Sequence, residues 1–506
     1  ICYSAPQGLL CAGKDDLLYR YLREESRWET VLCYGDSSLV MQPYQMLQLS
    51  EEWMAAYYYD SMKEGGARYE FYFLTKTDAA LLPERGEKEL VLAAGGLTEE
   101  LEQFIAEYNR TSGYHITVKY YQGADRVTRL SAAMVSSNPP DLVDLDQEMA
   151  LTFSGKGMLE DLAPYLEASD VLDREDFLEN LLDGYTLGGR LVSIPNAFDI
   201  DVTVGRASQV GTEAGWTAED VQALAAAHPD DELFKNPTFS SMVVLFTEEI
   251  LGRFIDWESG ECSFDGEEFA SLVRWMEEHS DGFGSSSPFY VSYSWDPTRV
   301  SEEELIRPRC SISSLATLLP YELYFGEEIT AIGDPMSDGR PYYQGSAQNT
   351  VAIAANSKNK EAAWQFLEAF LSRESYDILF GIPSRRDLLD KKAENMLTIK
   401  YERGENGDIL IYQGGEHKGE PVMKEKGRIS FEGELIPYYY MTQEQMDMVM
   451  EVIEHAEFTP VIGGCQYQII SILLEELGAY IDGQKSLEEA ADILQNRVQN
   501  LVQENM

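Results

Sequence analysis

Residues 90–121 read LVLAAGGLTEELEQFIAEYNRTSGYHITVKYY and contain, in order, the signals of a strand, a helix and a second strand. The apolar run ELVLAA at 89–94 is typical of a short buried strand, and two glycines then turn the chain. Thr98, followed by an acidic first turn, opens a helix whose apolar residues recur on one face. The β-branched and aromatic run HITVKYY at 115–121 predicts the second strand. The stretch therefore predicts a β-α-β unit.

The same alternation continues downstream. An amphipathic helix is expected at 127–136, and a third strand is expected at 141–145, after two prolines. Such an opening implies a largely parallel sheet, with ligands bound beyond the carboxyl ends of its strands. Capped helical periodicity recurs up to residues 486–502, and TVAIAA at 350–355 predicts a strand that leads into a helix. We predict an α/β fold with enough strand-helix alternation for two lobes.

Residues 1–86 have a different pattern. Short aromatic-rich runs bounded by turn residues predict five or six strands, and Pro83 and Gly86 mark a change of composition. We therefore place a domain boundary between a β-rich region, 1–86, and an α/β region, 87–506. Paired strands with tight turns suggest one or two blades of a β-propeller, whose faces need neighbouring blades to cover them. A small independent β module is the alternative.

The bulk composition excludes several classes of protein. The chain carries 88 acidic against 39 basic residues, a net charge of −49, so nucleic acid is not expected as a partner. Six cysteines and five histidines show no metal-ligand spacing, which predicts no metal site and no cofactor. No apolar run is long enough to span a bilayer. Because the chain begins with Ile1, we expect that a signal or a longer upstream segment has been removed.

Seven segments resemble, in the same order, the family 1 extracellular solute-binding proteins, the group that includes maltose-binding-like receptors of ATP-binding-cassette (ABC) importers. Besides residues 90–121, they are PPDLVDLD at 139–146, GMLEDLAPYLE at 157–167, LGGRLVSIPNAFDI at 187–200, GWTAEDVQALA at 215–225, ECSFDGEEFASLVRWM at 261–276 and VAIAANSKNKEAAWQFLEAFLS at 351–372. Two parts depart from the family pattern: residues 1–86, and the Gly- and charge-rich stretch 401–440, which resembles an insertion.

The resemblance implies a two-lobed clamshell of the periplasmic-binding-protein type (type II) that follows the short all-β region. It implies that a sugar or oligosaccharide binds between hinged lobes and passes to the permease subunits of an ABC importer. The expected location is extracellular, as a secreted protein or a lipoprotein, and the expected state is a monomer.

A sugar site needs aromatic faces for the apolar side of the ring and planar polar groups for the hydroxyls. Asp146 and Gln147 follow the third predicted strand, where such a sheet binds ligands, although an ordinary cap explains them equally well. Asp199 and Asp201 fall where the resemblance places the crossing between lobes. They could accept hydroxyl protons or form a supporting salt bridge.

Aromatic candidates come later in the chain. Trp295 lies in a Ser-, Pro- and Gly-rich loop and is the best candidate for stacking on a sugar, with packing of its own loop as the alternative. Tyr342, Tyr343, Ser346 and Gln348 form a polar aromatic segment directly before the strand at 350–355, and we expect it to be a binding loop.

No catalytic motif stands out. No G-x-S-x-G elbow is present, and among so many carboxylates a pair at glycosidase spacing arises by chance. We therefore expect a binding protein, not an enzyme, and assign no catalytic residue. The alternatives are an extracellular sensor or scaffold built on the same clamshell, and a glycan-degrading hydrolase or lyase.

Overall fold

The computed structural model describes most of the chain. The main stretches outside the description are residues 34–44, 61–67, 76–87, 285–303, 374–380, 398–401, 404–408, 411–424 and 459–464, with shorter gaps elsewhere. The chain forms two compact units. Unit 1 contains Ile1–Arg174, Thr186–Asn196 and Asn349–Leu379, and unit 2 contains Glu175–Tyr185, Ala197–Gln348 and Phe380–Met506.

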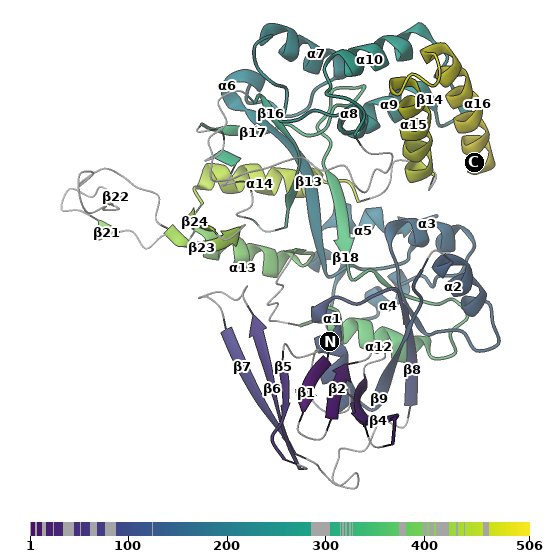
Figure 1. Cartoon of the computed structure of the whole chain (residues 1–506), viewed down its shortest axis with the longest axis vertical. Helices are drawn as coiled ribbons and strands as arrows, with labels where there is room; N and C mark the ends of the chain where they lie inside the picture. The colour runs from purple at the N-terminus through teal and green to yellow at the C-terminus, as the bar shows by residue number, and fades with distance from the viewer. Residues whose placement is uncertain are drawn as a thin grey trace. The chain divides into compact units, whose positions relative to one another are not determined.

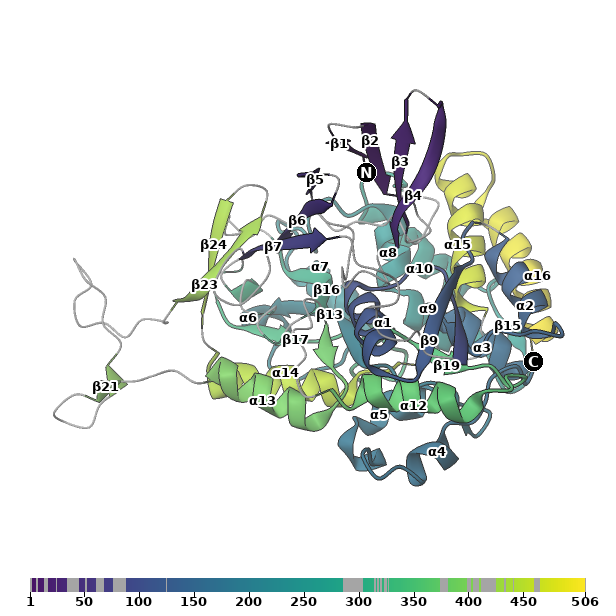
Figure 2. The same cartoon turned by 90° about the horizontal axis from the view of Figure 1, so that it is seen from below.

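The predicted β-α-β unit is confirmed in unit 1. Strand β8 (Lys88–Ala94) pairs in parallel with β9 (Tyr114–Tyr120) and with β10 (Leu142–Asp144), and β19 (Val351–Ile353) joins β10 antiparallel. Helix α1 (Glu99–Thr111) starts where expected, because the Thr98 hydroxyl accepts a hydrogen bond from the Leu101 amide at 3.3 Å. Helices α2 (Arg126–Met134) and α3 (Gln147–Gly155) follow the next two strands (Figure 2).

Apolar side chains hold the helices of unit 1 on its sheet. Phe104 of α1 packs on Phe366 and Phe370 of α12 (Lys360–Leu371), with ring centroids 5.3 and 5.1 Å apart. A second cluster joins residues of α2 and α3, such as Met134 and Phe153, to the strands. The remaining elements of the α/β part of unit 1 are α4 (Ala163–Glu167), β11 (Thr186–Leu187) and β12 (Arg190–Leu191), and the short helix η2 (Arg174–Asp176) begins at the last residue of its first segment and continues into unit 2.

The N-terminal region is all-β, as predicted, and forms two antiparallel sheets. The first contains β1 (Cys2–Ala5), β2 (Gly8–Ala12), β3 (Leu17–Leu22) and β4 (Arg27–Cys33), and the second contains β5 (Gln45–Gln48), β6 (Trp53–Asp60) and β7 (Arg68–Thr75). Cys11 is disulfide-bonded, whereas Cys262, Cys310 and Cys465 carry free thiols. Both sheets are meanders in strand order, the pattern that motivated the propeller-blade hypothesis.

Unit 2 is organised around one long strand, β13 (Ala197–Arg206), visible in Figure 1. It pairs antiparallel with β16 (Ile306–Ile312), β17 (Ile329–Ala331), β18 (Gln344–Gln348) and β20 (Ile382–Pro383). The other elements of this unit are α5 (Glu179–Gly184), α6 (Ala207–Val210), α7 (Ala218–Ala227), α8 (Phe239–Leu245), α9 (Thr247–Phe254), β14 (Ile255–Asp256), β15 (Glu261–Cys262), α10 (Glu267–Glu278), α13 (Arg386–Leu397), β21 (Glu402–Arg403), β22 (Ile409–Leu410), β23 (Glu425–Phe431), β24 (Glu434–Tyr439), α14 (Gln443–His455), α15 (Gln466–Ile481) and α16 (Leu487–Asn505).

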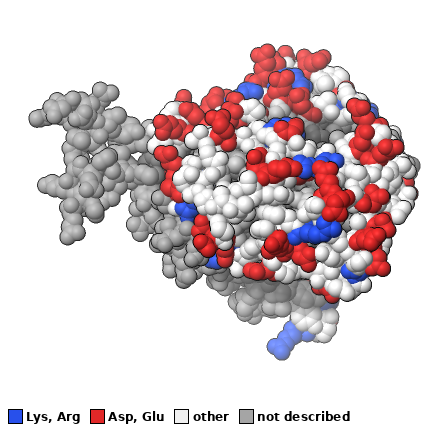
Figure 3. Space-filling model, turned by 90° about the horizontal axis from the view of Figure 1, so that it is seen from above, with Lys and Arg blue, Asp and Glu red and all other residues white. Residues whose placement is uncertain are grey.

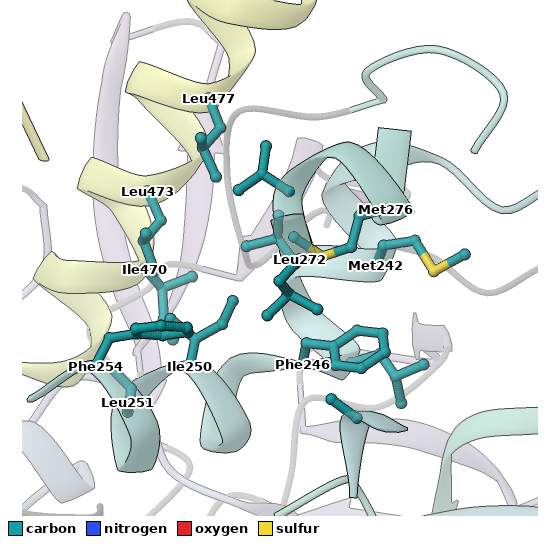
Figure 4. Close-up of a cluster of buried hydrophobic side chains, with 14 of the residues drawn as sticks. Met242, Phe246, Ile250, Leu251, Phe254, Leu272, Met276, Ile470, Leu473 and Leu477 are labelled. Atoms are coloured by element: carbon teal, nitrogen blue, oxygen red, sulfur yellow. The ribbon is translucent and has the colours of Figure 1, made fainter. Parts of the chain in front are cut away.

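Helices α7, α8, α9, α10, α15 and α16 of unit 2 share one apolar core. Figure 4 shows side chains of α8, α9, α10 and α15 converging in it, among them Phe246, Phe254, Leu272 and Leu473. All four are buried. Burial of this kind stabilises a fold by about 1.5–3 kcal/mol for each large apolar side chain, and it fixes the helices beside the sheet that carries β13.

Among the charged side chains on the surface seen in Figure 3, acidic ones prevail over basic ones. This distribution agrees with the net charge of −49 and disfavours a polyanionic partner. Among the described helices, none is both long enough and apolar enough to cross a membrane.

Candidate functional site

Two carboxylates of β13 lie on one face of the sheet in unit 2. Asp199 and Asp201 are two positions apart, so their side chains point to the same side of the strand. In the register of the sheet, Asp199 lies opposite Ser346, and Asp201 lies opposite both Gln344 of β18 and Ser311 of β16. Residues directly opposite each other share a face.

We call this group, together with Gln348 at the end of β18, the polar sheet face; its members are Asp199, Asp201, Ser311, Gln344, Ser346 and Gln348. Four of the residues predicted from the sequence are therefore brought together: Asp199, Asp201, Ser346 and Gln348. The prediction of a loop before the return strand is wrong, because residues 344–348 form β18 by pairing with β13.

Asp199 has one satisfied and one unsatisfied carboxylate oxygen. Gln348 Nε2 donates to Asp199 Oδ2 at 2.6 Å. The other oxygen, Oδ1, is buried and has no hydrogen-bond partner among the described residues. Burial raises the pKa of Asp199, and the bond from Gln348 opposes that shift. A buried oxygen without a donor costs about 1–3 kcal/mol, so this atom is suited to accept a hydrogen bond from a ligand.

The second carboxylate, Asp201, lies near a buried ion pair. Burial raises its pKa, while Arg309 and a hydrogen bond from Ser311 lower it. Arg309 Nη2 is 3.1 Å from Asp334 Oδ2, and its Nη1 donates to Gln344 Oε1 at 2.9 Å. Thr203 Oγ1 in turn donates to Asp334 Oδ1 at 2.6 Å. The network reaches the polar sheet face through the hydrogen bond from Arg309 to Gln344.

Arg309 was not predicted as a site residue. Its backbone has φ +46°, in the left-handed region, next to a register irregularity between β13 and β16. A non-glycine residue in this conformation is uncommon and persists where surrounding contacts impose it. Here the contacts are Asp334, Gln344 and the carbonyl of Val244, which accepts from Nη2 at 3.1 Å. One feature of the sequence could have indicated Arg309 as a site residue: it lies inside the strand-like run LIRPRCSI at 305–312, in a strongly acidic chain.

The two tyrosines before β18 are buried, each about 1% exposed. Tyr343 donates its hydroxyl proton to the carbonyl of Ala331 at 2.9 Å, and burial raises the pKa of Tyr342 well above its ordinary value. Neither ring presents a free face for stacking on a sugar in this structure. Trp295 lies outside the described residues. The role of these three aromatic side chains in binding stays a prediction.

Asp146 and Gln147 belong to unit 1, whereas the polar sheet face belongs to unit 2. Asp146 caps α3, because its Oδ1 accepts from the Met149 amide at 2.8 Å, and it also pairs with Arg126. Gln147 is the first residue of α3. Beside them, burial and the charge of Asp146 raise the pKa of Asp144 to about 7, while Arg126 opposes the shift. The cap accounts for Asp146, and a role of either residue in binding stays a prediction.

A further acid, Glu248 of α9, is buried behind the network. Gln466 Nε2 of α15 donates to Glu248 Oε1 at 2.6 Å, and Oε2 has no hydrogen-bond partner among the described residues. Burial raises the pKa of Glu248 to about 7; Arg309 opposes this shift, and Asp334 and Glu457 add to it. The ordinary value is 4.5, so the folded protein holds an extra proton between about pH 4.5 and 7.

A Glu248→Gln substitution should therefore flatten the pH dependence of stability. In the wild type, the contribution of Glu248 is lost as pH rises through 7, so at pH 8 the variant should be more stable by about 1–3 kcal/mol, and at pH 4 it should show no such gain. Urea unfolding at both pH values measures the difference. Glu278→Gln, at an exposed position of α10, is the control. An equal effect of the two substitutions at pH 8 would contradict the prediction.

Comparisons with known proteins bear on the family and the fold. Residues 94–204 match the family model described as bacterial extracellular solute-binding protein. No curated protein matches the chain. The sugar-binding protein MalE from Xanthomonas citri is 15% identical with a TM-score of 0.52, and the alignment covers 82% of this chain and 98% of that one. A de novo designed cysteine esterase is 14% identical with a TM-score of 0.52, covering 83% and 99%.

At these identities the structural matches concern the fold alone, and the activity of the esterase is a property of that designed protein. The fold is the type II periplasmic-binding-protein fold, as predicted, with a small all-β region at the N-terminus. The matched residues begin at the end of β8, contain α1 and β9 in unit 1, and reach most of β13 in unit 2. By the family model that matches residues 94–204 and by its fold, the chain is similar to the bacterial extracellular solute-binding proteins.

Proposed function

We propose that the chain binds a sugar or oligosaccharide outside the cell and delivers it to the permease of an ABC importer. The observation that carries this proposal is the polar sheet face. It combines two carboxylates with amide and hydroxyl groups in fixed register, a composition suited to ligand hydroxyls. The sugar-binding MalE with the same fold supports the solute class. No step of the proposal requires turnover of the sugar.

The expected location and organisation belong to the same proposal. The disulfide at Cys11 supports an oxidising compartment outside the cell, where such bonds persist. A secreted protein or a lipoprotein fits this location, and we propose a monomer. We further propose that residues 1–86 form part of a β-propeller, and that residues 87–506 form two α/β lobes joined by hinge crossings.

A thermal-shift screen of the purified chain against mono- and oligosaccharides, amino acids, peptides and polyols tests the function. A saturable rise in melting temperature with a sugar, recovered chemically unchanged, is the expected result.

Asp199→Asn should weaken sugar binding by about 10- to 100-fold, since a hydrogen bond to a charged group contributes about 1.5–3 kcal/mol. Asp265→Asn, at an exposed position of unit 2, should leave affinity unchanged.

Two results would count against the proposal. Conversion of the sugar to a product would favour a hydrolase or lyase. A shift with amino acids or peptides alone would assign a different solute class.

A further inference from the structure

The charges around the polar sheet face are unequal. Three carboxylates lie there or directly behind it, on Asp199, Asp201 and Asp334. Among the described residues, the cation that acts on Asp201 is Arg309. With one positive charge against three negative charges, the face is acidic.

Arg309 is already engaged by the protein. Its guanidinium contacts Asp334 Oδ2, Gln344 Oε1 and the carbonyl of Val244, all between 2.9 and 3.1 Å. The side chain is 16% exposed and Asp334 is 5% exposed, so the pair is shielded from water. Withdrawing Arg309 from Asp334 to bind an anion would leave a buried carboxylate uncompensated, which is strongly unfavourable. Arg309 therefore does not serve as an anion-binding group.

Among the described residues, no cation pairs with Asp199 as Arg309 pairs with Asp334. Burial raises the pKa of Asp199 and the hydrogen bond from the neutral side chain of Gln348 opposes that shift, while the charge of Asp199 raises the pKa of Asp201. Its Oδ1 is buried without a donor among the described residues. A ligand group that donates hydrogen, such as a hydroxyl or an ammonium, would satisfy that oxygen, whereas a group that only accepts would not. A carboxylate or phosphate on the ligand would add a like charge in a poorly solvated place.

We propose that the polar sheet face selects sugars without acidic groups and rejects uronates and sugar phosphates, with Asp199 as the residue that determines this specificity. The inference rests on the proposed function and narrows its substrate class. Like charges near a protein surface repel each other, and relaxation and salt reduce the repulsion. We therefore expect a discrimination on the order of 100-fold in Kd.

Matched pairs of oligosaccharides test the inference on the full chain. Gluco-, galacto- and manno-configured oligosaccharides are titrated beside the corresponding uronate oligosaccharides by calorimetry at pH 7.5. In the configuration that binds, the neutral member should bind about 100-fold more tightly than its uronate. The comparison uses the wild-type protein and so does not depend on the folding of a variant.

Asp199→Asn then assigns the effect to one side chain, because it keeps the shape and an acceptor oxygen but removes the charge. The ratio of neutral to uronate affinity should fall about 10-fold or more, whereas Asp265→Asn should keep the wild-type ratio. Uronate binding equal to or tighter than neutral binding would overturn the inference and leave the sugar-binding function standing. An unchanged ratio in Asp199→Asn would overturn the role of this residue. If neither kind of oligosaccharide binds, the proposed function itself fails.

Discussion

Arg309→Met should lower the free energy of unfolding by about 3–5 kcal/mol, because it removes one partner of a buried ion pair. The Asp334 side chain is 5% exposed, and among the described residues Thr203 would remain as its hydrogen-bond donor. The substitution also removes the donor to Gln344 and the cation that acts on Asp201. Methionine fills much of the vacated volume, so the loss reports mainly the unpaired carboxylates. Urea unfolding at pH 7.5 measures it.

Two controls separate the ion pair from the general effect of losing an arginine. Arg274 forms an exposed pair with Glu267, with side-chain exposures of 53% and 78%, so Arg274→Met should cost less than about 1 kcal/mol. Combining Arg309→Met with Asp334→Asn should recover part of the loss, because the buried charge is then gone. If Arg309→Met lowered the free energy of unfolding no more than Arg274→Met does, the prediction that the buried Arg309–Asp334 pair stabilises this part of unit 2 would be wrong.

Phe458→Ala should have an effect of similar size, about 3–5 kcal/mol, through a cavity in unit 2. The Phe458 ring is about 1% exposed and meets Phe198 of β13 edge to face, with centroids 5.0 Å apart. Two glycines make room for it: a Cβ on Gly184 or Gly345 would lie 2.6 or 2.4 Å from Phe458 atoms. The Phe458 ring therefore packs directly against both glycines, and the alanine side chain is too small to fill the space that the ring leaves.

The same substitution should weaken sugar binding, which a purely local cavity would not do. Gly345 lies between Gln344 and Ser346 in β18, and its amide donates to the carbonyl of Glu457 at 2.8 Å. Loss of the ring next to Gly345 loosens the strand that carries half of the polar sheet face. Phe458→Leu is the matched control and should cost about 1–2 kcal/mol with near-normal affinity. Equal stability of the Ala and Leu variants would contradict this packing.

Local patterns predicted most of unit 1. The Thr98 cap, the apolar spacing of α1 and the β-branched run of β9 each act within a few residues, so they can be recognised in the sequence without knowledge of the partner segments. The predicted second strand at 115–121 corresponds to Tyr114–Tyr120, displaced by one residue. The prediction of a loop at 344–348 is wrong. QGSAQ has no apolar alternation that would indicate a strand, and the segment forms β18 because it pairs with β13.

The sequence by itself determined the class of the molecule: an acidic α/β chain with a β-rich start, a β-α-β opening and a resemblance to solute-binding proteins. These properties depend on composition and short-range periodicity, which folding does not change. Only the tertiary structure decided which polar groups meet. Asp199 and Gln348 are 149 positions apart, and the register of β13 with β18 makes them neighbours. Arg309 pairs with Asp334 because its backbone adopts φ +46° and because both side chains are shielded from water. Both conditions depend on strands that are distant in the chain.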